Sequence, residues 1–550
     1  MRKFKRILAA VLSACMVTGL VACGGSSSGT GSKGGESSTT TNESGQIEEI
    51  VEANQAENGE YDPAGAAAYI YFTFQQECLE GLVSYDADGK IIPATAESWD
   101  VNDDATEYTF HLRDDAKWSD GSDVTSADFL NTITRALDPD KGSWYVDFLF
   151  VIQGAEEAFN GEADIADIGV ECPDDKTITF KLKEPTAYFL DLCKLPTYMP
   201  SNCKYATNDD EDWDMDPEKN LGNGPYHLAE RKAGEYITFE KNEYYYNADE
   251  VNVLKITEKF MDDDQAKSSA YQTGEINIWI GADNYTAEAY QGSEDLSYAE
   301  VPQTNYILFN INEEPFDDVR VRQAFALAVK RADIAAVVGS SCEPSTTFVG
   351  KNHHSKVDGT KWGELQGDLL EEDLEKAKAL LAEAGYENGE GLPEITYTYP
   401  SQSYEADVAQ VLQAQWQELG VTVNLEAMEY EVYVDERRSG KLQLCRHQWY
   451  ADYNDPTTWL LMYYKGNAQN DIGWDNEEYN KLLDESNKET DDAKRYEMLQ
   501  EAEKILVSED TVVCPLFTNN NNNLIDPTLE NYYFDGLGYA TWAYATKKSE

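Results

Sequence analysis

One stretch late in the chain, residues 442–456, joins a strand pattern to an acidic turn. Residues 442–450 are mostly large apolar and aromatic side chains without Gly or Pro, which predicts a buried strand. Residues 452–456 follow at once and are rich in turn formers. The pattern places the Asp452 carboxylate at the mouth of a strand, among aromatic residues, where it would suit a cation such as an ammonium group. The alternative is that Asp452 and Asp455 only close the turn.

The N-terminal part of the chain predicts export and anchoring. A basic start precedes residues 7–21, a mostly apolar segment that is too short to span a membrane comfortably as a mature helix. The segment ends in Leu-Val-Ala-Cys23, which resembles the lipobox of bacterial lipoproteins. The resemblance implies a signal peptide over residues 1–22 and a lipid on Cys23; the alternative is an ordinary secretory signal. Residues 23–46 are largely Gly, Ser and Thr, which predicts a flexible tether.

Charge and cysteine usage limit the classes of partner. The formal net charge is −60 at pH 7, which argues against nucleic-acid binding and against docking on anionic lipid. Seven cysteines follow Cys23 without a CxxC spacing that would suit zinc. Cys193 and Cys203 are the preferred disulfide pair, with free thiols as the open alternative. Because P-loop, Rossmann and HExxH motifs are also missing from the sequence, we predict neither a metal site nor a cofactor.

The rest of the chain mixes strand and helix patterns. Residues 108–112 alternate with period two, as in a half-buried strand. Residues 374–384 repeat apolar side chains at helical spacing, and an apolar helix face over residues 408–419 precedes a strand pattern at 421–425. This order indicates an α/β fold. The polar run 519–523 is predicted to be a loop.

Short motifs along the chain carry a family resemblance. They include Glu80-Gly-Leu-Val-Ser-Tyr-Asp, Pro93-Ala-Thr-Ala-Glu-Ser-Trp-Asp, Gly222-Asn-Gly-Pro-Tyr and a Pro315-Phe-Asp-Asp-Val-Arg segment. In this order they resemble the oligopeptide-binding lipoproteins of bacterial ABC importers, in the peptide/nickel-type extracellular solute-binding protein family 5. The resemblance covers roughly residues 60–545.

The resemblance implies an α/β, periplasmic-binding-protein-like fold of cluster C type. Two lobes would be joined by a hinge and would close over a ligand, with an extra domain inserted in the first lobe. The predicted boundaries are 47–79, 205–303 and 516–550 for lobe I, 80–204 for the extra domain, and 304–515 for lobe II.

The resemblance also implies a set of ligand residues. The amine-binding aspartate of the family falls on Asp452. Arg437 and Arg446 match arginines near the carboxyl end of the ligand, although Arg446 has the alternative of pairing with one of the many acids of this chain. Tyr430 and Tyr450 replace a tryptophan and a cysteine of the family pattern, which changes the pocket. The other predicted ligand residues are Gln448, Trp449, Ala67, Ala68, Tyr69 and Tyr145.

Together these features predict a lipid-anchored binding protein at the extracytoplasmic face of the bacterial membrane. It would be a monomer that captures oligopeptides in a cleft between the lobes and delivers them to an ABC permease for transmembrane transport, without enzymatic chemistry. One alternative is a protein of the same fold that binds a sugar, a nickel chelate or haem. Alternatives of other classes are a secreted hydrolase and a surface adhesin.

Overall fold

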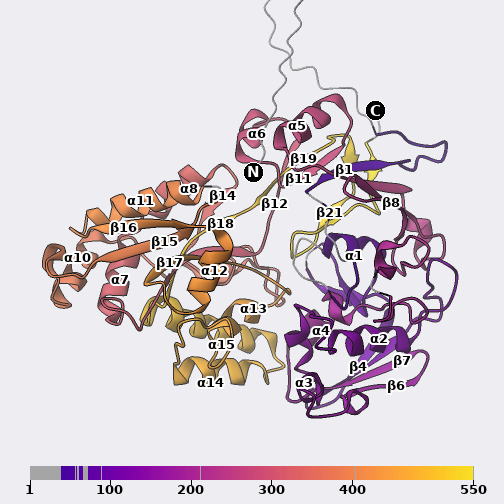
Figure 1. Cartoon of the computed structure of the whole chain (residues 1–550), viewed down its shortest axis with the longest axis horizontal. Helices are drawn as coiled ribbons and strands as arrows, with labels where there is room; N and C mark the ends of the chain where they lie inside the picture. Colours follow the sequence, from indigo (N-terminus) through magenta and orange to yellow (C-terminus); the bar gives the residue numbers. More distant parts are fainter. Residues whose placement is uncertain are drawn as a thin grey trace, which may run out of the picture. The chain divides into compact units, whose positions relative to one another are not determined.

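The computed structural model describes residues 39–55, 57, 61–65, 72–87, 89–210, 212–402 and 404–548. All of them belong to the unit Ser37–Glu550. Two large mixed sheets and a smaller four-stranded sheet organise this part of the chain (Figure 1). None of its helices combines the length and the apolar character needed to cross a bilayer.

The first large sheet has β1 (Ile50–Asn54) near its centre. This strand pairs in parallel with β10 on one side and β11 on the other, and Ile50 is fully buried in the apolar core beneath the sheet. The order of the seven strands is β12 (Leu296–Ala299), β19 (Asn521–Ile525), β11 (Ile278–Ile280), β1, β10 (Lys255–Phe260), β9 (Tyr236–Lys241) and β8 (Tyr226–Lys232).

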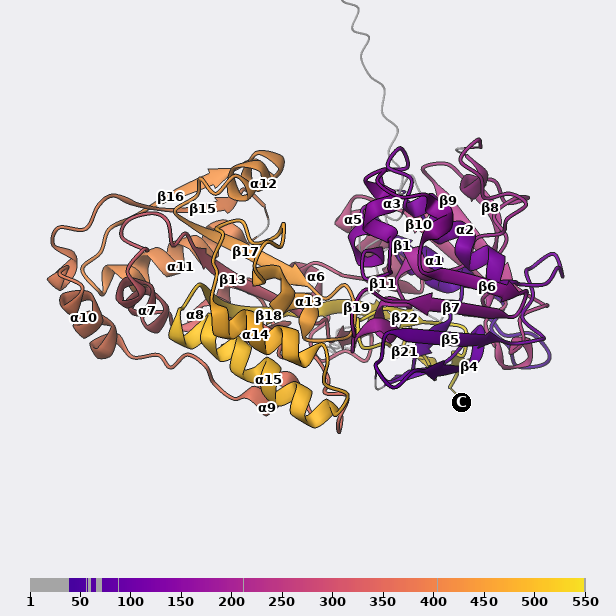
Figure 2. The same ribbon diagram turned by 90° about the horizontal axis from the view of Figure 1, so that it is seen from below.

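The second large sheet is built on β13 (Gln303–Phe309), in which every residue is buried. The second half of β13, residues 306–309, is apolar, as expected of a strand that is covered on both faces of its sheet. Helices α8 and α11 contact the strands of this sheet, and α14 and α15 pack against each other (Figure 2). The strand order is β14 (Cys342–Pro344), β18 (Val513–Asn519), β13, β17 (Leu444–Tyr450), β15 (Ile395–Pro400) and β16 (Val423–Met428).

The four-stranded sheet contains the predicted alternating strand, which is β5 (Glu107–Leu112). Tyr108, Phe110 and Leu112 are buried, as the alternation requires. Helix α2 packs beside the sheet against β6 and begins with a capping box, in which Thr125 N–H donates to the Asp128 carboxylate (2.9 Å). The order of the strands is β4 (Ala96–Val101), β5, β7 (Thr177–Lys181) and β6 (Val170–Asp174).

The remaining elements complete the architecture. The helices are α1 (Phe72–Cys78), α2 (Ser126–Ala136), α3 (Ala155–Phe159), α4 (Phe189–Leu192), α5 (Asp264–Thr273), α6 (Asn284–Ala289), α7 (Val319–Leu327), α8 (Arg331–Val338), α9 (Trp362–Gln366), α10 (Leu374–Glu383), α11 (Glu405–Gln417), α12 (Tyr430–Arg438), α13 (Thr457–Leu460), α14 (Glu477–Ser486) and α15 (Asp492–Lys504). The two-stranded pairs are β2 (Val83–Tyr85) with β3 (Ile91–Pro93), β20 (Leu529–Glu530) with β23 (Thr546–Lys547), and β21 (Tyr533–Phe534) with β22 (Ala540–Thr541).

The helix–strand patterns of the second half are confirmed with small shifts. The helix predicted over 374–384 is α10, and the unit predicted over 408–425 is α11 followed by β16. Gly420 separates α11 from β16 with φ of +82°. A Cβ at this glycine would lie 2.3 Å from the Asn388 carbonyl oxygen, so the sharp turn also depends on a close backbone approach.

The loop predicted over residues 519–523 is wrong. Asn519 ends β18, and β19 begins at Asn521 and runs between β12 and β11. The asparagine side chains bond to neighbouring backbone: Asn522 Nδ2 donates to Ala282 O (3.2 Å), and Asn523 Oδ1 accepts from Gly281 N (3.1 Å). Tertiary pairing therefore overrides the polar composition of the run.

The chain passes from one large sheet to the other at two places in this region. It leaves β12 and enters β13 through residues 300–302, and it leaves β18 and enters β19 through Asn520. The domain boundaries predicted near residues 304 and 516 stay predictions.

Cys193 and Cys203, the preferred pair if a disulfide formed, are not bonded to each other. All seven cysteines of the described chain are free; Cys193 is buried and Cys203 is exposed. The open alternative of free thiols therefore holds for this part of the protein.

Candidate functional site

Asp452 lies in a loop at the end of β17. Directly after the strand, Ala451 N–H donates to the carbonyl of Pro302 (2.9 Å). Asp452 N–H then donates to the hydroxyl of Thr458 in α13 (3.1 Å). These two bonds close the loop and hold the Asp452 carboxylate beside the edge of the six-stranded sheet.

The carboxylate of Asp452 is surrounded by hydroxyl groups. The Tyr145 hydroxyl donates to Oδ1 (3.1 Å) and the Thr458 hydroxyl to Oδ2 (3.4 Å), and no cation of the described residues pairs with it. Burial raises the pKa of Asp452 from 3.8 to about 7, while the two hydroxyl donors lower it. A half-buried carboxylate without a countercharge from the described residues gains from a cationic ligand, because such a ligand offsets its desolvation.

Aromatic rings from two distant segments surround this carboxylate. Tyr145 stacks on Phe148, with ring centroids 5.4 Å apart. Tyr188 stacks on Tyr453 at 5.3 Å and 11° between planes, and Phe148 meets Tyr453 edge-on at 5.8 Å. The site therefore combines the loop after β17 with Tyr145 and Phe148, which precede β6 and β7 in the chain, and Tyr188, which follows them. Aromatic rings beside a charge lower the local dielectric constant and strengthen charge–charge attraction.

Asp455, three residues further on, has a different environment. Arg495 donates to both of its carboxylate oxygens (2.7 Å each), and Lys356 Nζ lies 3.1 Å away. Burial raises the pKa of Asp455, but the two cations lower it more, so the net pKa falls below 3.8. Asp455 is thus held in the turn by its ion pairs, as the alternative expects, and the assignment of Asp452 to a ligand stays a prediction.

Lys356 also links the loop to the segment that carries the four-stranded sheet. Its ammonium group bonds to Asp191 in α4 as well as to Asp455. Tyr85 donates its hydroxyl to Asp191 (3.0 Å), and Asn454 Nδ2 donates to the carbonyl of Gly89 (2.9 Å). The loop that carries Asp452 is therefore bonded to α4 through Lys356 and to Gly89 through Asn454.

The strand before the loop has an open edge. On one side β17 pairs with β13 along its whole length, from Leu444 to Tyr450. On the other side β15 pairs with it only at Leu444 and Cys445. Over residues 446–450 this second side has no partner strand among the described residues. An extended chain can add to such an edge through backbone hydrogen bonds.

The predicted side chains around this edge differ in exposure. Gln448 lies on the face of β17 where its amide donates to Gln303 Oε1 (2.6 Å). Tyr450 and Tyr430 are 39% and 43% exposed, so both reach solvent. Trp449 is half-buried on the opposite face, and its indole N–H has no partner among the described residues. The assignment of these residues to the ligand stays a prediction.

Arg437 and Arg446 are already paired with acids. Arg446 Nε lies 2.7 Å from Glu405, and Arg437 forms an ion pair with Asp471. Arg446 lies on the face of β17 with Gln448, whereas Arg437 contacts His447 on the other face. The two guanidinium groups therefore lie on opposite sides of the strand, and their predicted role at the carboxyl end of a ligand stays untested.

Several predicted residues lie outside the described part of the chain. They are the predicted ligand residues Ala67, Ala68 and Tyr69, and Cys23, the predicted site of lipid attachment.

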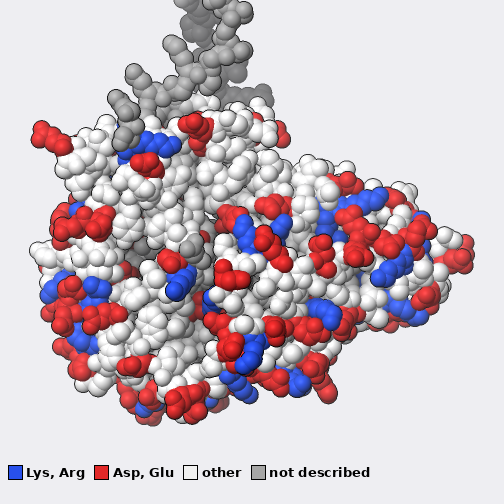
Figure 3. Space-filling view, turned by 180° about the vertical axis from the view of Figure 1, so that it is seen from behind, with Lys and Arg blue, Asp and Glu red and all other residues white. Residues whose placement is uncertain are grey.

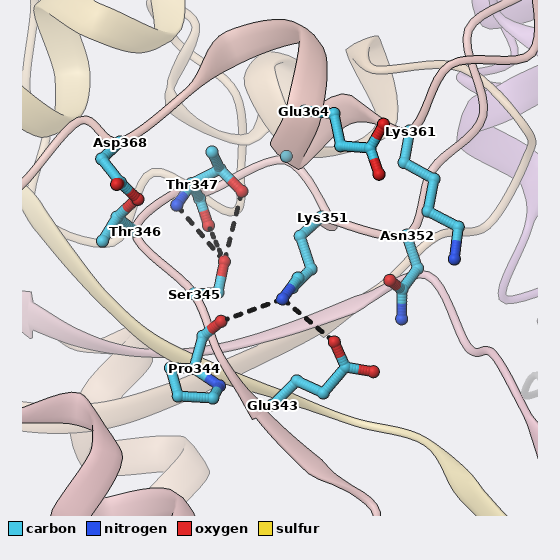
Figure 4. A pocket seen from close by; sticks show the side chains of 11 residues that line it. Glu343, Pro344, Ser345, Thr346, Thr347, Lys351, Asn352, Lys361, Glu364 and Asp368 are labelled. Atoms are coloured by element: carbon cyan, nitrogen blue, oxygen red, sulfur yellow. Dashed lines mark hydrogen bonds and ion pairs between the residues drawn. The ribbon is translucent and has the colours of Figure 1, made fainter.

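A separate cavity of about 270 Å³ lies elsewhere in the chain and is lined by residues between 343 and 368. Figure 4 shows Lys351 at its centre, bonded to Glu343 (3.0 Å) and to the carbonyl of Pro344 (3.2 Å). The cavity includes none of the predicted ligand residues, and its central lysine is satisfied by its own walls.

The sequence did not reveal the partners that fix the site. Thr458 follows Asp452 by six residues, and its place after a turn was the only available signal. Glu405, Lys356 and Asp191 are distant in sequence from the loop, and no local pattern connects them to it.

Comparison with known proteins agrees with the predicted class. Residues 90–471 match the bacterial extracellular solute-binding proteins, family 5 middle region. The dipeptide-binding protein DppE of Bacillus subtilis is 31% identical over 90% of this chain and 91% of its own length. The oligopeptide-binding protein OppA of the same organism is 30% identical over 97% of this chain and 96% of its own length.

A solved structure extends the agreement to the fold. Listeria monocytogenes OppA bound to peptide matches with a TM-score of 0.72 and 26% identity, over 92% of this chain and 99% of that one. The two-lobed, periplasmic-binding-protein-like α/β fold is thus confirmed. The chain belongs to the bacterial extracellular solute-binding proteins of family 5.

Proposed function

We propose that this protein captures oligopeptides outside the cytoplasm and delivers them to an ABC permease. The peptide α-ammonium group would bind to Asp452, and the first peptide bonds would add as an extended strand along the open edge of β17. The observation that carries the proposal is the Asp452 carboxylate, half-buried among hydroxyl and aromatic groups with no cation from the described residues beside it. Relatives named as oligopeptide- and dipeptide-binding proteins support it.

The proposal assigns the backbone contacts of the peptide to residues in both lobes. Gln448, Trp449 and Tyr450 would supply backbone from β17, and 67–69 would supply it from the other lobe. Because every peptide presents the same backbone groups, such pairing binds peptides of many sequences. Tyr145 and Tyr430 would line the side-chain pockets.

The proposal includes the predicted organisation of the chain. Residues 1–22 would be removed, Cys23 would carry lipid, and a monomeric body would remain at the outer face of the membrane on the tether 23–46. Lobe I, the extra domain and lobe II would have the boundaries given above. The protein would perform no chemical step.

The direct test is titration calorimetry with a short peptide. Asp452→Asn removes the negative charge but keeps the size of the side chain, and we expect the dissociation constant to rise at least about tenfold, since a charge-assisted bond contributes roughly 1.5–3 kcal/mol. The melting temperature of the empty protein should not fall. Asp103→Asn, at an exposed turn, is the matched control and should bind as wild type does. Equal affinity in Asp452→Asn and wild type would remove Asp452 from the site.

Native mass spectrometry of the purified protein tests the ligand class independently. A series of peptide masses released from the protein is expected. A single non-peptide mass would overturn the proposed substrate while leaving the family assignment intact.

A further inference from the structure

A carboxylate of the protein itself already occupies Arg446. Glu405 Oε1 lies 2.7 Å from Arg446 Nε, and the two side chains are only 6% and 14% exposed. Glu405 is the first residue of α11, so its position is set by the start of that helix. The pair is therefore built into the fold and is shielded from the solvent that weakens ion pairs at a surface.

One further nitrogen of the Arg446 guanidinium group is occupied by amides. Nη2 donates to Asn305 Oδ1 (3.1 Å) and to the side-chain oxygen of Gln448. Gln448 is in turn bonded to Gln303. The face of β17 beside the open edge is thus a neutral network of amides around one internally compensated ion pair.

The second candidate arginine is compensated in the same way. Arg437 pairs with Asp471, which is 1% exposed, and it lies on the opposite face of β17 beside His447. Each of the two guanidinium groups expected near the ligand carboxyl end is therefore matched by a carboxylate from the protein. By contrast, Asp452 has no cation from the described residues.

From this asymmetry we infer that the protein recognises a peptide by its amino end and its backbone, and does not recognise its carboxyl end. The inference rests on the proposed function. A peptide carboxylate that approached Arg446 would meet Glu405, and two like charges around one guanidinium group in a dry site repel each other. Peptides with a free carboxylate, an amidated end or a continuing chain would then bind alike.

The test uses four versions of one peptide, with the amino end free or acetylated and the carboxyl end free or amidated. They are titrated calorimetrically into the wild-type protein, and the set is repeated for lengths of about two to six residues. We expect acetylation to weaken binding at least about tenfold, and amidation to change the dissociation constant less than about threefold at every length.

A variant at Glu405 tests the inference through a gain of selectivity for peptides with a free carboxyl end. Glu405→Gln leaves Arg446 with an uncompensated charge, which a peptide carboxylate can neutralise. At the length that reaches Arg446, we expect the free peptide to bind at least about tenfold more tightly than its amide. The double variant Glu405→Gln with Arg446→Gln should bind the free peptide and its amide with similar affinity, as the wild type does. Glu375→Gln, an exposed glutamate in the first turn of α10, is the matched control.

The outcomes separate this inference from the proposed function. A wild-type protein that prefers the free carboxylate at least about tenfold over the amide would overturn the inference and leave the proposed function standing. Lack of selectivity in folded Glu405→Gln at every length would overturn the role of Glu405. If none of the four peptides binds, the proposed function fails and the inference fails with it.

Discussion

At the scale of single residues, two aspartates three positions apart perform different tasks. Asp455 is neutralised by Arg495 and Lys356 and so stabilises the turn. Asp452 is left with two hydroxyl donors, and burial raises its pKa to about 7. Ionising this carboxyl group therefore carries a desolvation cost that a bound ammonium group can offset.

This difference predicts a pH dependence of binding. An ammonium group binds the ionised carboxylate, and the raised pKa of Asp452 means that this form is lost as pH falls below about 7. We expect the affinity for a free-amino peptide to fall about tenfold between pH 7 and about pH 5.5. Calorimetric titration across this range checks the expectation. Asp452→Asn should bind weakly with a flat profile, and an equal slope in that variant would contradict the assignment.

At the scale of elements, β17 was largely predictable and its surroundings were not. The apolar run 442–450 indicated a strand, and the turn formers after it placed Asp452 at its end. The missing information is tertiary, because the neighbours of β17 in the sheet, β13 and β15, come from distant residues, 303–309 and 395–400. The run 519–523 illustrates the limit: its composition indicated a loop, but buried backbone partners make it parts of two strands.

The same limit applies to the candidate site. The sequence and its resemblance singled out Asp452 and Tyr145, which the structure brings together. It left the pairing of Arg446 open, since an arginine in a chain with so many acids has many possible partners. The choice of Glu405 depends on where α11 starts relative to β17, and local sequence carries no information on that.

Two neighbouring strands of the other sheet carry a second pH-dependent feature. Glu52 on β1 is the register partner of Glu258 on β10, and both are buried. Burial and the nearby Glu258 charge raise the pKa of Glu52 to about 8, against a lowering bond from Trp542, and burial raises that of Glu258 to about 7. Ionising either carboxyl group in the folded protein is therefore costly.

The sign of the effect follows from proton binding. Below pH 4.5 both folded and unfolded chains hold these protons; between pH 4.5 and about 8 the unfolded chain releases them first. The free energy of unfolding should therefore fall as pH rises through this range. We expect Glu52→Gln to recover roughly 1–3 kcal/mol at about pH 8.5 relative to about pH 5.5, measured by urea unfolding. Glu97→Gln, on an exposed face of β4, should change nothing.

At the scale of the whole described chain, charge is distributed unevenly between surface and interior. On the face in Figure 3, Asp and Glu side chains are spread widely, with Lys and Arg among them. The buried network of Asp191, Lys356, Asp455 and Arg495 is instead balanced in charge and joins α4 to the loop after β17. Buried pairs of this kind depend on each partner, because removing one leaves another uncompensated.

Substituting Lys356 removes the group that joins Asp191 in α4 to Asp455 in the loop after β17. We expect Lys356→Met to lower the free energy of unfolding by about 3–5 kcal/mol and to weaken peptide binding about fivefold under conditions where the variant is folded. Adding Asp191→Asn should restore part of both losses, because it removes an uncompensated buried charge. Chemical unfolding and calorimetry provide the measurements.

The matched control is Lys351→Met, in the separate cavity of Figure 4, which should leave peptide affinity unchanged. If Lys356→Met bound peptide as tightly as wild type, the connection would have no part in presenting Asp452.

The passage of the chain from β18 to β19 through Asn520 also affects when the two large sheets can be completed during synthesis. Strand β18 lies inside the six-stranded sheet, between β14 and β13, and β19 lies inside the seven-stranded sheet, between β12 and β11. Both come from residues 513–525, which follow all the other strands of these two sheets in the sequence and are therefore synthesised after them. The edge strands β12 and β14 therefore have no neighbour in their sheets until residues 513–525 have been synthesised, so neither sheet can reach its final pairing before then.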